Sequence, residues 1–397
     1  MMTRFEAGTY RGWRRHMGCR VLFLSLILVL AGSNGLAGAD GPEISPDELL
    51  AGTLLSLDSG LSDIANDDEV MLLSDDMWRF LETHVDDRAR SFVKLNQLVY
   101  AVISEGSFDL EYEETTRTAA DTFRAKRGNC MSFTNMFVVM ARAVGLDARF
   151  QEVDIPPDWT FNEDTYVLNL HINIYIDLGV TGKHIVDFNI EDFKGSYEMR
   201  VVSDQRALAH FFNNLGVERM QYGDITTAFF AFRRAIAEND SRFAPAWTNL
   251  GTLYNRQGLS EYAEAAYLQA LEVDRSDHIA MSNLSALYQR RGDQEQARYY
   301  RNRVNSHRKQ NPYYRYHMAR EAFLAKDYDS AISHLKYAAR KRRDEDRFCA
   351  LLGLVYLHQG DEKKSQKWMA RAEKLAETDA LKQIYSSKIA RLKSESR

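Results

Sequence analysis

The sequence GNCMSFTNMFVVMARAVGLDARF, residues 128–150, decides how the first half of this chain folds. Asn129 suits a helix N-cap, and the apolar residues from Met131 to Val144 predict one buried helix that ends at Gly145. Cys130 is therefore expected in the first turn. Unpaired N–H groups and the positive end of the helix dipole favour a thiolate there and could hold an oxyanion. The pattern predicts a cysteine nucleophile.

Two strands with one apolar and one polar face follow this helix. In LNLHINIYIDLG, residues 168–179, and HIVDFNIEDF, residues 184–193, apolar and polar side chains alternate. If the strands form an antiparallel hairpin whose paired residue numbers sum to about 358, Asp187 lies across from His171. Such neighbours are ~5 Å apart, close enough for the carboxylate to orient an imidazolium. We predict a site composed of Cys130, His171 and Asp187.

These residues resemble the transglutaminase-like branch of the papain-like cysteine enzymes over about residues 90–200. The matching pieces are GNCMSFTNMFVVMARAVGLDARF, HINIYI and VDFN. The resemblance implies an α+β domain in which Cys130 is the nucleophile, His171 the general base and acid, and Asp187 the residue that orients His171. Asn173 stands where many relatives carry an aromatic residue, a departure that concerns the shape of the substrate site.

Each of the three site residues has an alternative assignment. A single cysteine among apolar residues is ordinarily an inert core residue, and only the helix-start position and the two partners favour reactivity for Cys130. His184 could replace His171, but it lies at a strand entry beside Lys183 and is typical of a turn. Asp177 lies six residues from His171 along one strand, ~20 Å away, and is discarded.

After residue 205 the sequence repeats with a nearly constant period. Small residues recur at spacings of 35, 34, 34 and 34, namely at Gly216, Gly251, Ser285, Ala319 and Gly353. The period and the pattern of the second unit, from Trp247 to Ala270, resemble the tetratricopeptide repeat. Together the two resemblances imply an α+β transglutaminase-like (papain-like) domain followed by an all-α tetratricopeptide-repeat solenoid. Such arrays present a curved surface to a peptide or protein.

Some positions depart from the repeat pattern. Arg301 replaces a large apolar residue in unit three and Lys326 replaces a glycine in unit four, so these hairpins are expected to be distorted or turned toward a ligand. Cys349 takes the packing position that Trp247 fills in unit two, which predicts a buried thiol.

The first 39 residues have the pattern of a secretory signal peptide. Arginines precede the apolar run VLFLSLILVLAG, residues 21–32, which is too short to span a membrane, and Ala37 with Ala39 predicts cleavage after Ala39. A periplasmic or secreted protein is expected. An inner-membrane protein anchored by an uncleaved leader is the alternative.

We therefore divide the 397-residue chain into four parts: a signal peptide (1–39), the transglutaminase-like domain with a helical N-terminal part (40–204), about five repeats (205–378), and a capping helix with a charged tail (379–397). The second part carries a net charge of −19, whereas residues 205–397 carry +10. These opposite charges suggest that the acidic part docks on the array, with the run Arg340–Arg343 as the candidate contact.

The predicted function is that of an exported cysteine enzyme. It would act on amide or peptide bonds of protein or envelope substrates, as a hydrolase or acyltransferase, through a thioester. The alternative is a catalytically inactive repeat scaffold or adaptor in the cell envelope. The predicted partner is a protein or peptide on the repeat groove, with an anionic envelope component as a second candidate. Because the sequence contains neither metal-ligand spacing nor a phosphate-binding loop, we expect no metal and no cofactor. Nucleic acid is a poor partner for an exported protein and is not expected.

Overall fold

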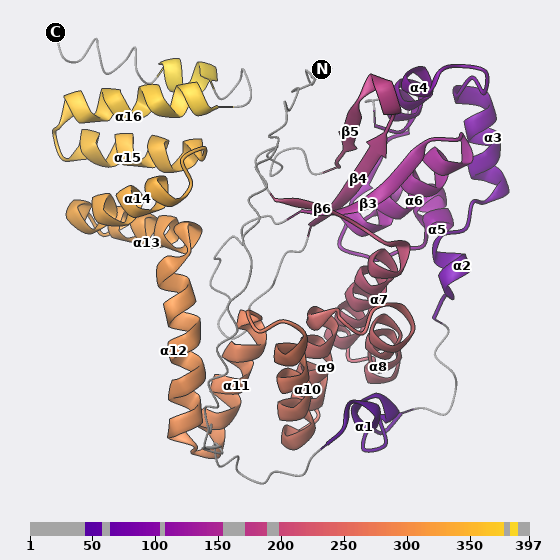
Figure 1. Ribbon diagram of the computed structural model, residues 1–397, viewed down its shortest axis with the longest axis horizontal. Coiled ribbons are helices and arrows are strands. Elements are labelled where there is room, and N and C mark those ends of the chain that lie inside the picture. The colour runs from indigo at the N-terminus through magenta and orange to yellow at the C-terminus, as the bar shows by residue number, and fades with distance from the viewer. Residues whose placement is uncertain are drawn as a thin grey trace, which may run out of the picture.

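The computed structural model describes residues 44–57, 64–103, 108–153, 171–188, 198–376 and 382–387 (Figure 1). The predicted signal peptide lies outside these residues, as does most of the predicted C-terminal cap. An α/β part extends to residue 202, and helical hairpins follow from residue 204. The predicted fold class is confirmed. No helix in the described part of the chain is long and apolar enough to cross a membrane.

The described residues of the α/β part form six helices and two sheets. The helices are α1 (Pro46–Ala51), α2 (Asp67–Val70), α3 (Asp75–His84), α4 (Ser91–Ile103), α5 (Ala119–Ala125) and α6 (Cys130–Ala143). A small parallel sheet pairs β1 (Glu111–Tyr112) with β2 (Arg127–Gly128). The main sheet has the order β5-β4-β3-β6 and consists of β3 (Asp147–Val153), β4 (His171–Asp177), β5 (Lys183–Val186) and β6 (Met199–Val202), with the short 3₁₀ turn η1 (Gly179–Thr181) before β5.

Helix α6 forms as its sequence predicts. Asn129 is its N-cap and accepts a hydrogen bond from the N–H of Ser132, and Gly145 adopts a φ of +82° just beyond its end. From Met131 to Ala141 every residue of α6 is buried. Phe137 of α6 and Phe150 and Ile174 of the main sheet belong to one hydrophobic core, which fixes the start of α6 against this sheet.

The predicted hairpin register is wrong by two residues. β4 and β5 are antiparallel, but Ile174 pairs with Val186 and Asp177 with Lys183, so paired numbers sum to 360. Extending this register past the end of β5 places Asp187 across from Asn173 and diagonal to His171. The turn Gly179–Gly182 sets the register, because Gly179 and Gly182 both have positive φ and Leu178 bonds to Gly182. The apolar alternation alone does not distinguish shifts of two.

Five helical hairpins make up the array. They are α7 (Asp204–Gln221) with α8 (Ile225–Arg234) and its π-helical extension η2 (Ala235–Asn239), α9 (Ala244–Arg256) with α10 (Ser260–Val273), α11 (His278–Arg291) with α12 (Gln294–Gln310), α13 (Pro312–Leu324) with α14 (Tyr328–Lys341), and α15 (Asp346–His358) with α16 (Glu362–Leu375).

The fourth hairpin keeps its turn despite the missing glycine. Four turns of the array contain a glycine with φ between 77° and 84°, namely Gly223, Gly258, Gly292 and Gly360. Lys326 adopts a φ of 62° in the fourth hairpin, so a lysine accepts the left-handed conformation there. Arg301 lies on the exposed side of α12, where it donates a hydrogen bond to Gln289. We expected the hairpin of unit four to be distorted, but its described turn is not.

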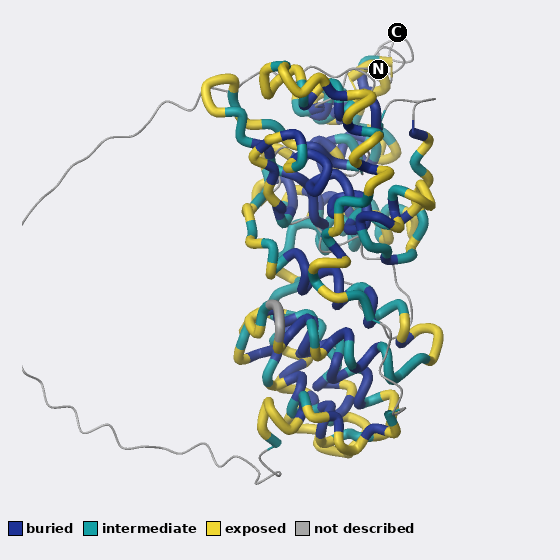
Figure 2. The backbone as a smooth tube through the Cα atoms, turned by 90° about the vertical axis from the view of Figure 1, so that its right-hand side faces the viewer, coloured by how far each residue is buried: buried dark blue, intermediate teal, exposed yellow. Residues whose placement is uncertain are grey.

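The boundary between hydrophobic cores falls within the array and not between the array and the main sheet. One cluster runs from Leu49 to Val304 and includes the main sheet and the first three hairpins, whereas smaller clusters begin at Ala319. Figure 1 shows α12 between the first hairpins and the stack of α13 to α16. Figure 2 shows buried residues inside and exposed residues around them. The sheet and the first repeats thus share one core.

Charged side chains also join the sheet to the first repeat. Glu152 of β3 accepts hydrogen bonds from Arg206 Nε and His210 Nε2 of α7, at 2.6 and 2.7 Å, and also pairs with Arg200 of β6. Burial alone would raise the pKa of Glu152, but the bonds from His210, Arg200 and Arg206 outweigh it and hold this pKa well below its usual range. The acidic part therefore meets the array at the first repeat, and the predicted contact with the run Arg340–Arg343 stays a prediction.

Candidate active site

Cys130 is the first residue of α6 and is half-buried. The loop before α5 holds the N-cap residue in place, because Asn129 Nδ2 donates to Thr116 Oγ1 at 2.9 Å and Thr116 N donates to Glu218 of α7 at 2.9 Å. Cys130 thus lies at the positive end of a fourteen-residue helix, where backbone N–H groups are free of intrahelical partners.

The structure brings the three predicted site residues together. His171 begins β4 and Asp187 directly follows β5, and the distance from His171 Nε2 to Asp187 Oδ2 is 2.7 Å. Both side chains are buried, with 6% and 5% of their surface exposed. Cys130 contributes to the raised pKa of His171, so the sulfur lies near the ring. Because Asp187 occupies Nε2, Nδ1 is the ring nitrogen left for the sulfur.

The surroundings of His171 favour its protonated form. Burial by itself lowers the pKa of the ring, but the hydrogen bonds to Asp187 and Cys130 and the charges of both partners outweigh it and raise the pKa to about 9. Burial and the charge of Cys130 also raise the pKa of Tyr112. At pH 7 the arrangement favours an imidazolium at His171.

Asn173 is a site residue whose role the sequence did not reveal. Its Nδ2 donates to Asp187 Oδ2 at 2.9 Å, so one carboxylate oxygen accepts from both His171 and Asn173. In the sequence, Asn173 stands out only because it replaces the aromatic residue that many relatives carry there. The available signal was its place on the polar face, two residues after His171. A hydrogen-bonded amide replaces an aromatic ring beside the orienting carboxylate.

The rejected candidates lie elsewhere in the sheet. His184 pairs with Ile176 in the β4–β5 ladder, and its ring packs 5.7 Å from that of Phe92. Asp177 is at the opposite end of β4 from His171 and accepts a hydrogen bond from the backbone of Gly179. Neither side chain is placed to assist Cys130.

Cys349 is a core thiol. It is 1% exposed and packs with Ala372, Ala376 and Tyr385 at the end of the array. Burial raises the pKa of its thiol to about 11. Within the described chain, the two free cysteines therefore have contrasting surroundings.

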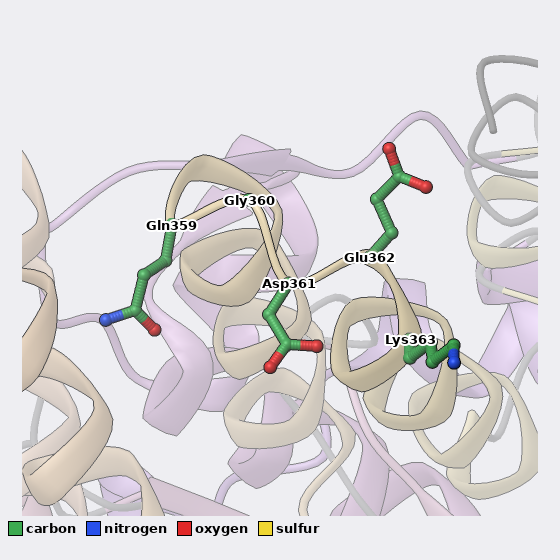
Figure 3. A pocket seen from close by; sticks show the side chains of 5 residues that line it. All are labelled: Gln359, Gly360, Asp361, Glu362 and Lys363. Carbon is green, nitrogen blue, oxygen red and sulfur yellow. The ribbon is translucent and has the colours of Figure 1, made fainter.

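Two surface hollows lie away from the sulfur. One follows five consecutive residues, Gln359–Lys363, in the turn between α15 and α16, and Figure 3 shows that their side chains point in different directions. The other, of about 620 Å³, lies between the loop Thr115–Thr118 and α7, on the far side of the N-cap of α6. Neither hollow contains Cys130 or His171.

Comparisons with known proteins agree with this architecture. The family model described as the transglutaminase-like superfamily matches residues 82–181, and the tetratricopeptide-repeat model matches residues 244–277 and 346–379. No curated protein matches the chain.

Several solved structures are similar to the array. MamA protein has 17% identity, covering 44% of this chain and 94% of its own, with a TM-score of 0.24. YrrB, a repeat protein with an unusual peptide-binding site, has 16% identity, coverages of 44% and 89%, and a TM-score of 0.24. Pseudomonas aeruginosa pilF has 13% identity, coverages of 48% and 87%, and a TM-score of 0.27. The family models, which match residues 82–181 and then 244–277 and 346–379, show a transglutaminase-like core domain followed by tetratricopeptide repeats.

Proposed function

We propose that this chain is an exported cysteine enzyme that breaks amide bonds through a thioester on Cys130, and that its repeats recruit a protein partner. The observation that carries the proposal is the convergence of three side chains: the sulfur at the start of α6, the His171 ring whose pKa Cys130 helps to raise, and Asp187 2.7 Å from that ring. A core cysteine has no need of such partners.

In the proposed reaction the Cys130 thiolate attacks a carboxamide or peptide carbonyl carbon. The N–H groups at the start of α6 stabilise the oxyanion, and His171 gives its proton to the departing amine as the C–N bond breaks. Water or a second amine then attacks the thioester, returns a proton to His171 and releases Cys130. Hydrolysis and acyl transfer use the same residues.

The test is to incubate envelope extracts with wild type, Cys130→Ala and Cys349→Ala, and to search by mass spectrometry for proteins that shorten or become cross-linked. Wild type and Cys349→Ala should give the same products, and Cys130→Ala none. Products that persist with Cys130→Ala would contradict the proposal. If no protein changes with any variant and Cys130 labels with iodoacetamide at pH 6 as slowly as Cys349, the inactive scaffold is the better description.

Export is a separate part of the proposal and rests on the leader sequence. N-terminal sequencing of the protein from its native host should find Asp40 as the first residue. An intact leader in a membrane fraction would favour the anchored alternative.

An anionic envelope component is the weaker partner proposal. Three arginines of the third hairpin, whose charge would attract such a polymer, already bond within the array, since Arg290 donates to Asn255, Arg291 pairs with Glu264 and Arg301 donates to Gln289. Binding to an anionic polymer that does not weaken with salt would remove this proposal.

A further inference from the structure

An N-terminal segment of this chain lies on the repeats in the manner of a bound peptide. Helix α1 and the turn after it, residues 45–55, contact the face of the first two repeats formed by Phe229, Tyr254 and Tyr262. Figure 1 shows α1 beside α8 and α10, far from the sheet in the view. We call this part of the array the tyrosine face.

We propose that the tyrosine face is a peptide-binding site, that residues 45–55 occupy it as an internal ligand, and that a partner's peptide of the same chemistry exchanges with them. This chemistry is a short helix in which an acidic residue directly precedes a leucine and a glycine follows three positions later, as in Glu48, Leu49 and Gly52. The inference rests on the proposed recruitment of a protein by the repeats and is independent of the thioester chemistry.

Different side chains of the array bind different parts of the segment. The Tyr262 hydroxyl donates to the Glu48 carboxylate, and the Tyr254 hydroxyl donates to the carbonyl oxygen of Leu49. The Leu49 side chain is 1% exposed. A carboxylate, a main-chain carbonyl and an apolar side chain are thus recognised together, which is how peptide sites combine affinity with specificity.

Gly52 adds a steric requirement. Its φ is +65°, which ends α1 in the left-handed region, and a Cβ atom built on it would lie 2.5 Å from Cζ of Phe229. Both the conformation and the close approach exclude larger residues. Leu55, 8% exposed, then gives the segment a second apolar anchor.

The segment has the properties of a ligand that can leave. Helix α1 has six residues and depends on the array for its stability, because so short a helix is marginal in water. The exposed residues Asp47, Ala51 and Leu54 alternate with the buried anchors, so one side of the segment binds and the other faces solvent. One surface can therefore be filled either by this segment or by an equivalent peptide.

The test uses the full chain with Leu49→Asp, which weakens the internal ligand, and a fluorescent peptide of residues 44–57 as the probe. Anisotropy should show saturable binding to Leu49→Asp with a Kd of roughly 10–100 μM, the range expected for a short peptide site. Wild type should bind the probe at least about tenfold more weakly because its site is filled. Leu54→Asp is the matched control, since Leu54 is 54% exposed in the same segment and this variant should behave like wild type.

A probe carrying Gly52→Ala should not bind Leu49→Asp, because its methyl group would meet Phe229. A folded Leu49→Asp that fails to bind the unmodified probe would overturn the proposal. If Leu49→Asp unfolds, hydrogen exchange of wild type decides: the amides of residues 49–55 should exchange at least about a hundredfold faster than those of α9 and α10. Equal rates would overturn the proposal. Alkylation of Cys130, measured in parallel, reports on the enzyme proposal separately.

Discussion

Nε2 of His171 lies 2.7 Å from Oδ2 of Asp187, although the two residues are diagonal rather than directly opposite in the β4–β5 hairpin. The residue in the opposite position is Asn173, which bonds to the same oxygen. Asp187 is thus held from two sides, and its carboxylate supports the protonated form of the ring. This arrangement gives the site a characteristic pH dependence.

The stability that His171 contributes should decline as pH rises. Its folded-state pKa of about 9 exceeds the unfolded value of 6.5, so the contribution is complete below pH 6.5 and is lost as pH rises through about 9. The rise corresponds to about 3 kcal/mol. Urea unfolding of wild type and His171→Gln should show the wild-type advantage shrinking by this amount between pH 6 and pH 9.5. An advantage that does not change with pH would show that the ring is neutral throughout.

Asn173→Ala should slow iodoacetamide alkylation of Cys130 by about tenfold, the effect of one lost hydrogen bond to a charged group. Asp187 would lose one of the hydrogen bonds that hold its carboxylate, so the upper limb of the pH profile, where the imidazolium loses its proton, should also move to lower pH. Gln151→Met is the matched control. Gln151 pairs with Asn173 across the sheet and is buried with its Oε1 atom unpaired. Gln151→Met should nevertheless leave the pH profile of Cys130 alkylation unchanged. An unmoved profile in Asn173→Ala would make Asn173 merely structural.

Much of this site could be predicted because its parts have local signals. Asn129 and Gly145 mark the two ends of α6, and polar alternation places His171 on a strand. The register could not be predicted, because strands with a period of two fit equally well at every even shift and only the turn decides. The pattern therefore identified Asp187 as the partner of His171 while assigning it the wrong position.

The shared core and the bound N-terminal segment could not be predicted for a different reason. Repeat periodicity describes how each hairpin packs on the next, and Glu152 or Leu49 carries no mark that it contacts a residue far along the chain. The contact of Leu49 with Tyr254 joins residues 205 positions apart. Such contacts depend on the whole fold.

Cys349 should resist alkylation in the native protein. The measurement uses a Cys19→Ser variant, which leaves Cys130 and Cys349 as the remaining cysteines. At pH 8, a thiol with a pKa of about 11 is ionised in about one molecule in a thousand, and burial blocks access to Cys349. Peptide mapping should therefore find label on Cys130 alone under native conditions and on both cysteines in guanidinium. Native labelling of Cys349 would mean that the end of the array opens readily.

Glu152→Gln should weaken the junction between the sheet and the first repeat. Removing one partner of a buried ionic network typically costs about 3 kcal/mol or more, so the free energy of unfolding at pH 7 should fall by that order. The pKa of Glu152 is depressed, so its contribution is present above pH 4.5 and is lost as pH falls further. The difference between wild type and variant should therefore narrow in acid.

Asp147→Asn, on the same strand, is the control for Glu152→Gln. Its pair with Arg149 is solvent-exposed, and this variant should change the free energy of unfolding by less than about 1 kcal/mol. Equal effects of the two substitutions would mean that the network around Glu152 does not hold the sheet on α7.

The effect of a glycine-to-alanine substitution on stability should depend on the residue that faces the new methyl group. A Cβ on Gly251 would lie 2.7 Å from the Tyr267 ring and 3.1 Å from the backbone oxygen of Ala263, neither of which can move far. The same atom on Gly353 would meet the flexible side chain of Met369 at 2.8 Å, which can turn away. Gly251→Ala should therefore destabilise the protein by about 1–3 kcal/mol through overpacking. In Gly353→Ala, the gain in helix propensity of about 1 kcal/mol should offset a smaller clash. Chemical unfolding of both variants checks this order, and a greater loss in Gly353→Ala would show that the closeness of the helices, rather than the stiffness of the facing residue, sets the cost.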